Sequence, residues 1–221
     1  MKKIFAIALC VAMLAIVLVS GTMAYFTDTE AKTNTFTLGK VAIDLEEPSY
    51  TPAADGTLKV FPGQSYDKDP TITVASDSES CYLVATVTIS QRSDLYALYA
   101  DNSSSWALSL LGENGLISGA ITEYDAADAV ENEVSGILLD DKVFLTYAED
   151  TTADTVTFTF YFKEIHEAND VEVLFTNVNI PSIIDNGDID GNLDITVQAY
   201  AIQSTGFGDV YAAYAAYQAQ A

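Results

Sequence analysis

Among the side chains of this sequence, an acidic turn with the sequence DNGDIDGNLD is best suited to binding a metal ion. Carboxylate and amide oxygens clustered this closely are typical of calcium sites, and two glycines let the backbone bend. Aligned as an EF-hand loop from Asn186, the turn has Val197 where a bidentate glutamate is needed. The same residue types favour a plain turn between strands, so both interpretations stay open. The candidate calcium ligands are Asp185, Asp188, Asp190, Asn192 and Asp194.

The single histidine, His166, lies in the sequence HEAND. A zinc peptidase helix of the HExxH type needs a second histidine four residues later, where this chain has Asp170. A lone imidazole among scattered carboxylates is an uncommon zinc site, and a serine triad would need that same histidine. We therefore interpret His166 as a surface residue in a turn. We expect a protein that is not an enzyme and has no cofactor, calcium excepted.

The N-terminus has the pattern of an export signal. Lys2 and Lys3 precede an apolar run of sixteen residues, 4–19, which is followed by small residues. Thr22 and Ala24 fit the small-residue subsites of a signal peptidase, which predicts a signal peptide at 1–24 and a mature chain that begins at Tyr25. A run of sixteen is shorter than the roughly 20 residues that span a bilayer. We expect secretion, with membrane contact only before cleavage.

The mature chain is strongly acidic and has one cysteine. The full sequence holds 32 acidic and 9 basic residues, a net charge of −23, and loss of two lysines with the signal makes this −25. Such a charge argues against nucleic acid or anionic lipid as a partner. Cys81 cannot form an intrachain disulfide, and in the sequence CYLVATVTI it is in phase with apolar residues. We expect a thiol in the core, with an intermolecular disulfide as the alternative.

Strict alternation of apolar and polar residues predicts strands with one buried face. The clearest case is TVTFTFYFK, where phenylalanine alternates with threonine and tyrosine. Because each sheet must hide its apolar face against another layer, the pattern indicates an all-β, antiparallel two-sheet sandwich. The alternating segments lie at 41–45, 72–74, 81–89, 143–147, 155–163, 171–175 and 193–199.

Two parts of the chain depart from this rhythm. Residues 93–140 predict short helices and loops, which we interpret as an insertion between strands of a single domain, 25–221. At the C-terminus, Asp209 is a suitable N-cap for an alanine-rich helix. Tyr211, Tyr214 and Tyr217 lie on one stripe of that helix, which we expect to pack on the sandwich.

The junction TMAYFTDTEAKTNTFTLGKVAIDL resembles the N-terminus of the TasA and camelysin (CalY) family, secreted proteins processed by a SipW-type signal peptidase. Two later segments, VFPGQSYDKDPTITV and FTNVNIPSIIDNGDIDGNLDITVQAYAIQSTGF, are similar to strands of that family. The matches bracket most of the mature chain and leave 93–140 unassigned. The resemblance implies a jelly-roll β-sandwich. For several members it also implies biofilm-matrix fibres, built by donation of an N-terminal strand to the next subunit.

The segment 25–38 has the character of such a donor strand. Tyr25 and Phe26 lie at the new terminus, and Phe36 and Leu38 close the segment. An extended segment from another chain can fill a free sheet edge with main-chain hydrogen bonds, and a head-to-tail contact that does not close gives a filament. The same segment can instead fold back as the first strand of its own sandwich. Sequence leaves both topologies open.

The expected function is therefore a secreted, noncatalytic structural protein of a single-membrane bacterium. It would assemble into extracellular fibres or a surface or biofilm matrix, with its own copies or related fibre subunits as partners. Two alternatives remain. One is a surface adhesin or binding module stabilised by calcium at the acidic turn. The other is a metalloprotease, because camelysin-like members of the family have been described as such.

Overall fold

The fold is that of a computed structural model, which describes residues 40–52, 58–99, 106–122, 137–139, 142–182, 184, 189 and 192–220. These residues belong to one compact unit, 39–221. Its largest sheet is antiparallel, with strand order β11-β4-β8-β7-β6. In β8, burial alternates residue by residue, as the sequence pattern predicts. The strands are β4 (Cys81–Ser90), β6 (Ile137–Leu139), β7 (Val143–Asp150), β8 (Thr155–Phe162) and β11 (Ile195–Gln203).

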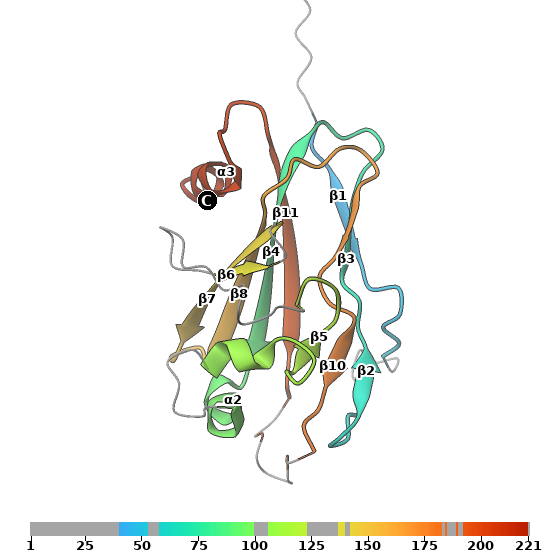
Figure 1. Cartoon of the computed structure of the whole chain (residues 1–221), viewed down its shortest axis with the longest axis vertical. Coiled ribbons are helices and arrows are strands. Elements are labelled where there is room, and N and C mark those ends of the chain that lie inside the picture. Colours follow the sequence, from blue (N-terminus) through green and yellow to red (C-terminus); the bar gives the residue numbers. More distant parts are fainter. Residues whose placement is uncertain are drawn as a thin grey trace, which may run out of the picture. The chain divides into compact units, whose positions relative to one another are not determined.

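Two smaller antiparallel sheets lie across from the large one (Figure 1). The all-β sandwich predicted from the sequence is confirmed. All of the strands predicted from alternation are present, whereas the short strands β2, β5, β6 and β10 were not predicted. One sheet is β1 (Ile43–Glu46), β3 (Thr71–Val74) and β9 (Val171–Val173), and the other is β2 (Ser65–Asp67), β10 (Asn177–Asn179) and β5 (Ile117–Ser118).

The main core lies between these layers. Phe158 and Phe160 of β8 are fully buried there and belong to one cluster with Ile72 of β3 and Phe175, which follows β9. Cys81 belongs to the same cluster and is 0% exposed. The predicted core position of this cysteine is therefore confirmed.

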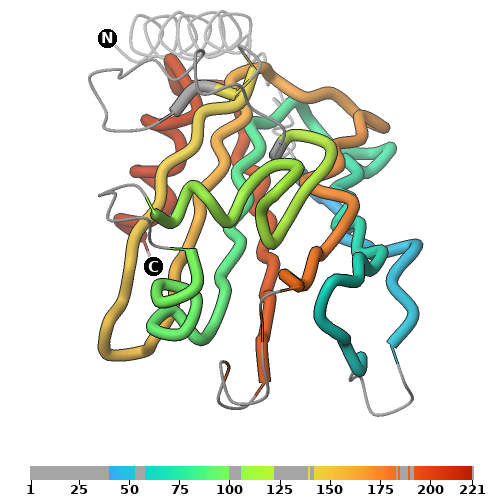
Figure 2. Tube along the Cα trace, turned by 60° about the horizontal axis from the view of Figure 1, so that its bottom comes forward, coloured from blue at the N-terminus to red at the C-terminus, as the bar shows by residue number. Residues whose placement is uncertain are grey.

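The outer face of the large sheet carries the C-terminal helix α3 (Val210–Gln218), on the side away from β1 and β3 (Figures 1 and 2). The Asp209 carboxylate accepts a hydrogen bond of 2.8 Å from the Ala212 amide and caps the helix, as predicted. Tyr214 is buried against Tyr161 and Tyr200, with ring centroids 5.7 and 5.6 Å apart. The predicted docking of the helix on the sandwich is thus confirmed.

The segment between β4 and β7 contributes more to the core than the sequence suggested. It contains the helix α2 (Arg92–Tyr99), the 3₁₀ helices η1 (Trp106–Leu110) and η2 (Ala120–Thr122), and the strands β5 and β6. Leu95, Trp106 and Leu110 are buried in the main cluster. The segment therefore carries part of the hydrophobic core as well as loops and short helices.

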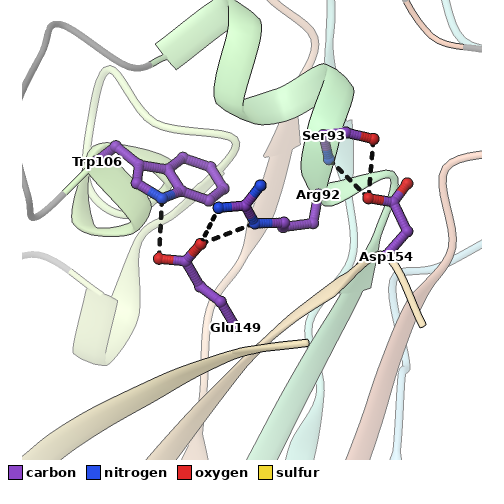
Figure 3. Close-up of polar contacts among 5 residues, drawn as sticks. All are labelled: Arg92, Ser93, Trp106, Glu149 and Asp154. Atoms are coloured by element: carbon purple, nitrogen blue, oxygen red, sulfur yellow. Dashed lines mark hydrogen bonds and ion pairs between the residues drawn. The ribbon is translucent and has the colours of Figure 1, made fainter. Parts of the chain in front are cut away.

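A polar cluster ties this segment to the hairpin of β7 and β8 (Figure 3). The Glu149 carboxylate accepts hydrogen bonds from Arg92 Nε at 2.7 Å and Nη2, and from Trp106 Nε1 at 3.0 Å. The Arg92 guanidinium also lies over the Trp106 ring, 5.5 Å from its centroid. Ser93 donates to Asp154 through its amide and hydroxyl, at 2.9 and 2.8 Å. The start of α2 is therefore fixed to the hairpin turn.

We expect Glu149→Gln to destabilise the protein by about 1 to 3 kcal/mol, because three donors lose a charged acceptor whose side chain is 24% exposed. Urea unfolding followed by circular dichroism measures the loss. The matched control is Asp77→Asn, which breaks the Lys40–Asp77 pair, whose side chains are 62% and 65% exposed. An exposed pair contributes little, so the control should leave the unfolding midpoint nearly unchanged. Equal losses in both variants would contradict the structural role of Glu149.

Candidate assembly edge

β11 forms the edge of the large sheet. Along its nine residues it pairs with β4 on one side, and no other described strand is hydrogen-bonded to it. The other edge strands of the three sheets, as far as the structure describes them, have between two and four residues. β11 is therefore the longest edge strand in the described part of the protein, and an added strand would gain the most main-chain hydrogen bonds there.

The hydrogen bonds of β11 show which groups face the free edge. The Ser204 amide donates to the Ser80 carbonyl at 3.1 Å, and the Ser90 amide donates to the Asp194 carbonyl at 3.0 Å. Because pairing alternates along an antiparallel strand, the even-numbered residues exchange hydrogen bonds with β4. The N–H and C=O groups directed away from β4 are those of Ile195, Val197, Ala199, Ala201 and Gln203.

β11 has no charged side chain, because its sequence is ITVQAYAIQ. Sheet edges are usually protected from association by charges, prolines, bulges or short length. The edge strand β1 follows that rule with the sequence IDLE, and β9 follows it with VEV. β11 carries none of these devices, and its core-facing side chains pack against the main hydrophobic cluster. The β11 edge is therefore suited to main-chain hydrogen bonding with an added strand.

The first described residue, Lys40, lies near one end of this edge. The Lys40 carbonyl accepts a hydrogen bond of 2.8 Å from the Glu79 amide, two residues before Cys81, which pairs with Gln203 of β11. β1 lies close to β11 but is hydrogen-bonded to β3. The segment 25–38 spans about 46 Å when extended, against about 30 Å for a nine-residue strand. It is therefore long enough to cover a complete β11 edge.

The sequence predicted a strand at 193–199 but did not identify it as an edge. A strand's neighbours follow from topology, which alternation does not reveal. No local signal in the sequence marks the edge, because the interior strands β4 and β8 also lack charged side chains.

The predicted cleavage and donor residues lie outside the described residues. They are Thr22, Ala24, Tyr25, Phe26, Phe36 and Leu38. Their roles stay predictions.

The predicted calcium ligands lie mostly outside the described part as well, which includes Asn192 and Asp194 but not Asp185, Asp188 or Asp190. The Asn192 carbonyl accepts from the Ser90 hydroxyl at 3.3 Å, and the Asp194 amide donates to that hydroxyl at 2.8 Å. These contacts fix the end of the acidic turn to β4. Calcium binding stays a prediction.

The interpretation of His166 as a surface residue is wrong, because the side chain is buried, with 5% of the residue exposed. Two main-chain hydrogen bonds with Cys81, of 2.8 and 2.9 Å, draw it against β4. Its Nε2 lies 3.0 Å from Glu172 Oε1, and its ring packs edge-to-face on Phe162. The Nδ1 atom is buried without a hydrogen-bond partner among the described residues.

The surroundings of His166 do not fit a catalytic zinc ion. Such a site needs three protein ligands that converge on one point. Within the described ranges, no three side chains of His, Cys, Asp or Glu lie close enough together to hold a metal. The Nε2 atom faces one glutamate, and the packed Phe162 ring occupies another side of the imidazole. The described residues therefore provide no peptidase metal centre.

Burial raises the pKa of the Cys81 thiol from 9.0 to about 11, with a further contribution from the carboxylates of Glu167 and Asp170. Between these values the unfolded chain loses the thiol proton and the folded chain keeps it. Stability should therefore be unaffected below pH 9 and fall as the pH rises to 11.

We expect Cys81 to account for a loss of about 2 to 3 kcal/mol across this pH range. Urea unfolding at a series of pH values measures the loss, and Cys81→Ala should show a correspondingly smaller decline. The folded thiol should also resist a disulfide reagent at neutral pH and react after unfolding. Rapid labelling of the native protein would contradict its burial.

Together, the fold and the edge define an acidic all-β sandwich with a long, unprotected strand at one side. A family model described as camelysin metallo-endopeptidase matches residues 1–70. The predicted resemblance to the TasA and camelysin family is thereby confirmed over this part of the chain. No curated protein matches the sequence. None of the described helices is long and apolar enough to cross a membrane.

Proposed function

We propose that the mature chain is a secreted structural protein that assembles into extracellular fibres or a surface or biofilm matrix. The observation that carries this proposal is the β11 edge, which has nine residues, no charge and no described partner on one side. The segment 25–38 of a neighbouring copy, or of a related fibre subunit, supplies the missing strand. Signal cleavage before Tyr25, by a SipW-type peptidase, would free that segment.

The chemistry of the two partners supports this pairing. Main-chain groups of five β11 residues point to the free edge, and each hydrogen bond contributes about 0.5 to 1.5 kcal/mol net. Phe36 and Leu38 are two residues apart, so in a strand they lie on one face. Placed beside the core-facing residues Val197 and Ala199, they extend the hydrophobic core of the acceptor.

Donation to another copy, rather than folding back, is favoured by strand direction. β1 and β4 run antiparallel to β3 and β11 respectively, and the chain enters β1 from Lys40, beside the Gln203 end of β11. A segment folded back along its own β11 would therefore run parallel to it and reverse sharply before β1. A neighbour's segment is free to pair antiparallel, which is the slightly more stable arrangement.

We expect deletion of residues 25–35 from the mature protein to abolish filaments in electron microscopy while leaving the folded domain intact. Ala199→Pro should have the same effect, because proline removes an N–H from the free edge and keeps the bonds to β4. Gln198→Pro is the matched control: its N–H bonds to β4, so this change should unfold the sheet.

Circular dichroism distinguishes a folded Ala199→Pro protein from an unfolded Gln198→Pro protein. A mature protein that stays monomeric under all conditions, or a deletion variant that associates like the full mature chain, contradicts donor-strand assembly. Filaments formed normally by a folded Ala199→Pro protein would place the acceptor edge elsewhere.

The description of the matching family favours a second candidate, a metallo-endopeptidase. Under the structural proposal, the purified mature protein does not cleave casein. Cleavage that is inhibited by a chelator and lost in a folded His166→Ala protein, but kept in Cys81→Ala, would establish the peptidase instead. Cleavage that persists in His166→Ala would identify a contaminating protease.

A further inference from the structure

The outer face of the large sheet holds two uncharged rows of side chains beside α3. The pairing registers bring together residues on neighbouring strands β11, β4, β8 and β7. The row next to the helix is Gln198, Thr86, Thr159 and Thr146.

The second row is Thr196, Thr88, Thr157 and Ala148. The hydroxyls of Thr88 and Thr157 lie 3.0 Å apart and are hydrogen-bonded. We call these two rows the threonine face. Thr196, Gln198 and Ala148 are exposed and most of the other members are half-buried, as expected for side chains that shade one another on a sheet.

The threonine face is bounded on both sides by different chemistry. Beyond its first row, Tyr161 and Tyr200 are covered by the tyrosines of α3. Beyond its second row, Asp194 is hydrogen-bonded to Ser90, and Asp150 lies at the other end of the same register. Charged residues typically make up a quarter to a third of a protein surface. None of the eight residues of the threonine face is charged.

We propose that the threonine face is a lateral contact surface for a second copy of this chain, so that filaments associate side by side. This rests on the proposed function, because the β11 edge must first align many copies. Mature chains of net charge about −25 repel one another, and a surface without charge is where two copies approach at least cost. Facing sheets then interdigitate threonine methyls, with hydroxyls free to hydrogen-bond across the contact.

The size of the face explains why it would act between filaments. Four strands and two rows cover about 19 by 14 Å, or roughly 270 Å² per copy. Two such faces bury far less than the ~1,200 Å² of a stable dimer, so single copies do not pair through it. A filament repeats the face along its length, and many weak contacts then add up to firm association.

α3 is compatible with this contact. A helix is about 10 Å across, which is also the spacing of two packed sheets. A second sheet packed on the threonine face would therefore lie at about the same height above the large sheet as α3, beside the helix.

Beads coated with many copies of the mature protein, attached through the N-terminus, test the contact without filaments. We expect unmodified beads to cluster under a microscope, and more so at higher salt, which screens the repulsion. Thr157→Glu should keep its beads dispersed. The matched control is Thr73→Glu, the same change at a half-buried threonine of the central strand β3 in the other layer.

Clustering of unmodified and Thr73→Glu beads with dispersal of Thr157→Glu beads supports the proposal. The proposal is overturned if unmodified beads stay dispersed, if Thr157→Glu beads cluster, or if both variants lose clustering equally. Clustering that requires an added neutral polysaccharide also overturns it and assigns the face to that ligand. Electron microscopy of Thr157→Glu should show single filaments where the unmodified protein forms bundles. Absence of filaments would contradict the proposed function. The bead experiment would still show whether the threonine face mediates contact between copies.

Discussion

The hydrogen bonding of β4 on both sides is the constraint on which the rest of this structure depends. Of its ten residues, seven pair with β8 along one edge and nine pair with β11 along the other, and eight are buried. One face of the strand enters the main core, and the other holds Tyr82 and Val84 beneath α3. The bridge from Cys81 to His166 fixes its first residue, and Ser90 holds the end of the acidic turn.

This central position of β4 leaves β11 at the edge. β11 is as long as an interior strand because all nine of its residues pair with β4. It also has the composition of an interior strand, because its side chains contribute to both faces of the large sheet. A strand of that kind normally has neighbours on both sides. Such an edge is usually either covered by another segment of the same chain or paired with a strand of another molecule.

The alternation of residue types predicted the sandwich because burial on one face of a strand leaves a period of two in the sequence. Strands such as β8 and β4 are long enough to show several periods. β2, β5 and β10 have two or three residues, which is too short for a pattern. The same local reasoning placed Cys81 in the core correctly, since its neighbours in phase are apolar. It failed for His166, whose burial comes from main-chain bonds to a strand 85 residues earlier in the sequence.

The sequence predicted a donor segment, which lies outside the described residues, and missed the candidate acceptor edge. A donor segment is a local feature, marked by a cleavage junction and aromatic anchors. An acceptor edge is a property of the sheet order β11-β4-β8-β7-β6, which depends on contacts between distant residues. The nine uncharged residues of β11 do not mark the edge, because β4 and β8 inside the sheet also lack charge.

In the proposed assembly, charge constrains how copies of this chain approach each other. A net charge of about −25 keeps monomers apart at distances near the Debye length, roughly 8 Å at physiological ionic strength. Contacts that form against this repulsion must be short-range and nearly free of charge. The β11 edge meets that condition with main-chain hydrogen bonds, and the threonine face meets it with hydroxyl and methyl groups. The two surfaces share Thr196 and Gln198 but point in perpendicular directions, since one is an edge of the sheet and the other its face. In the proposed assembly, growth along the edge would leave the face open, and the same repulsion would confine association to these two directions.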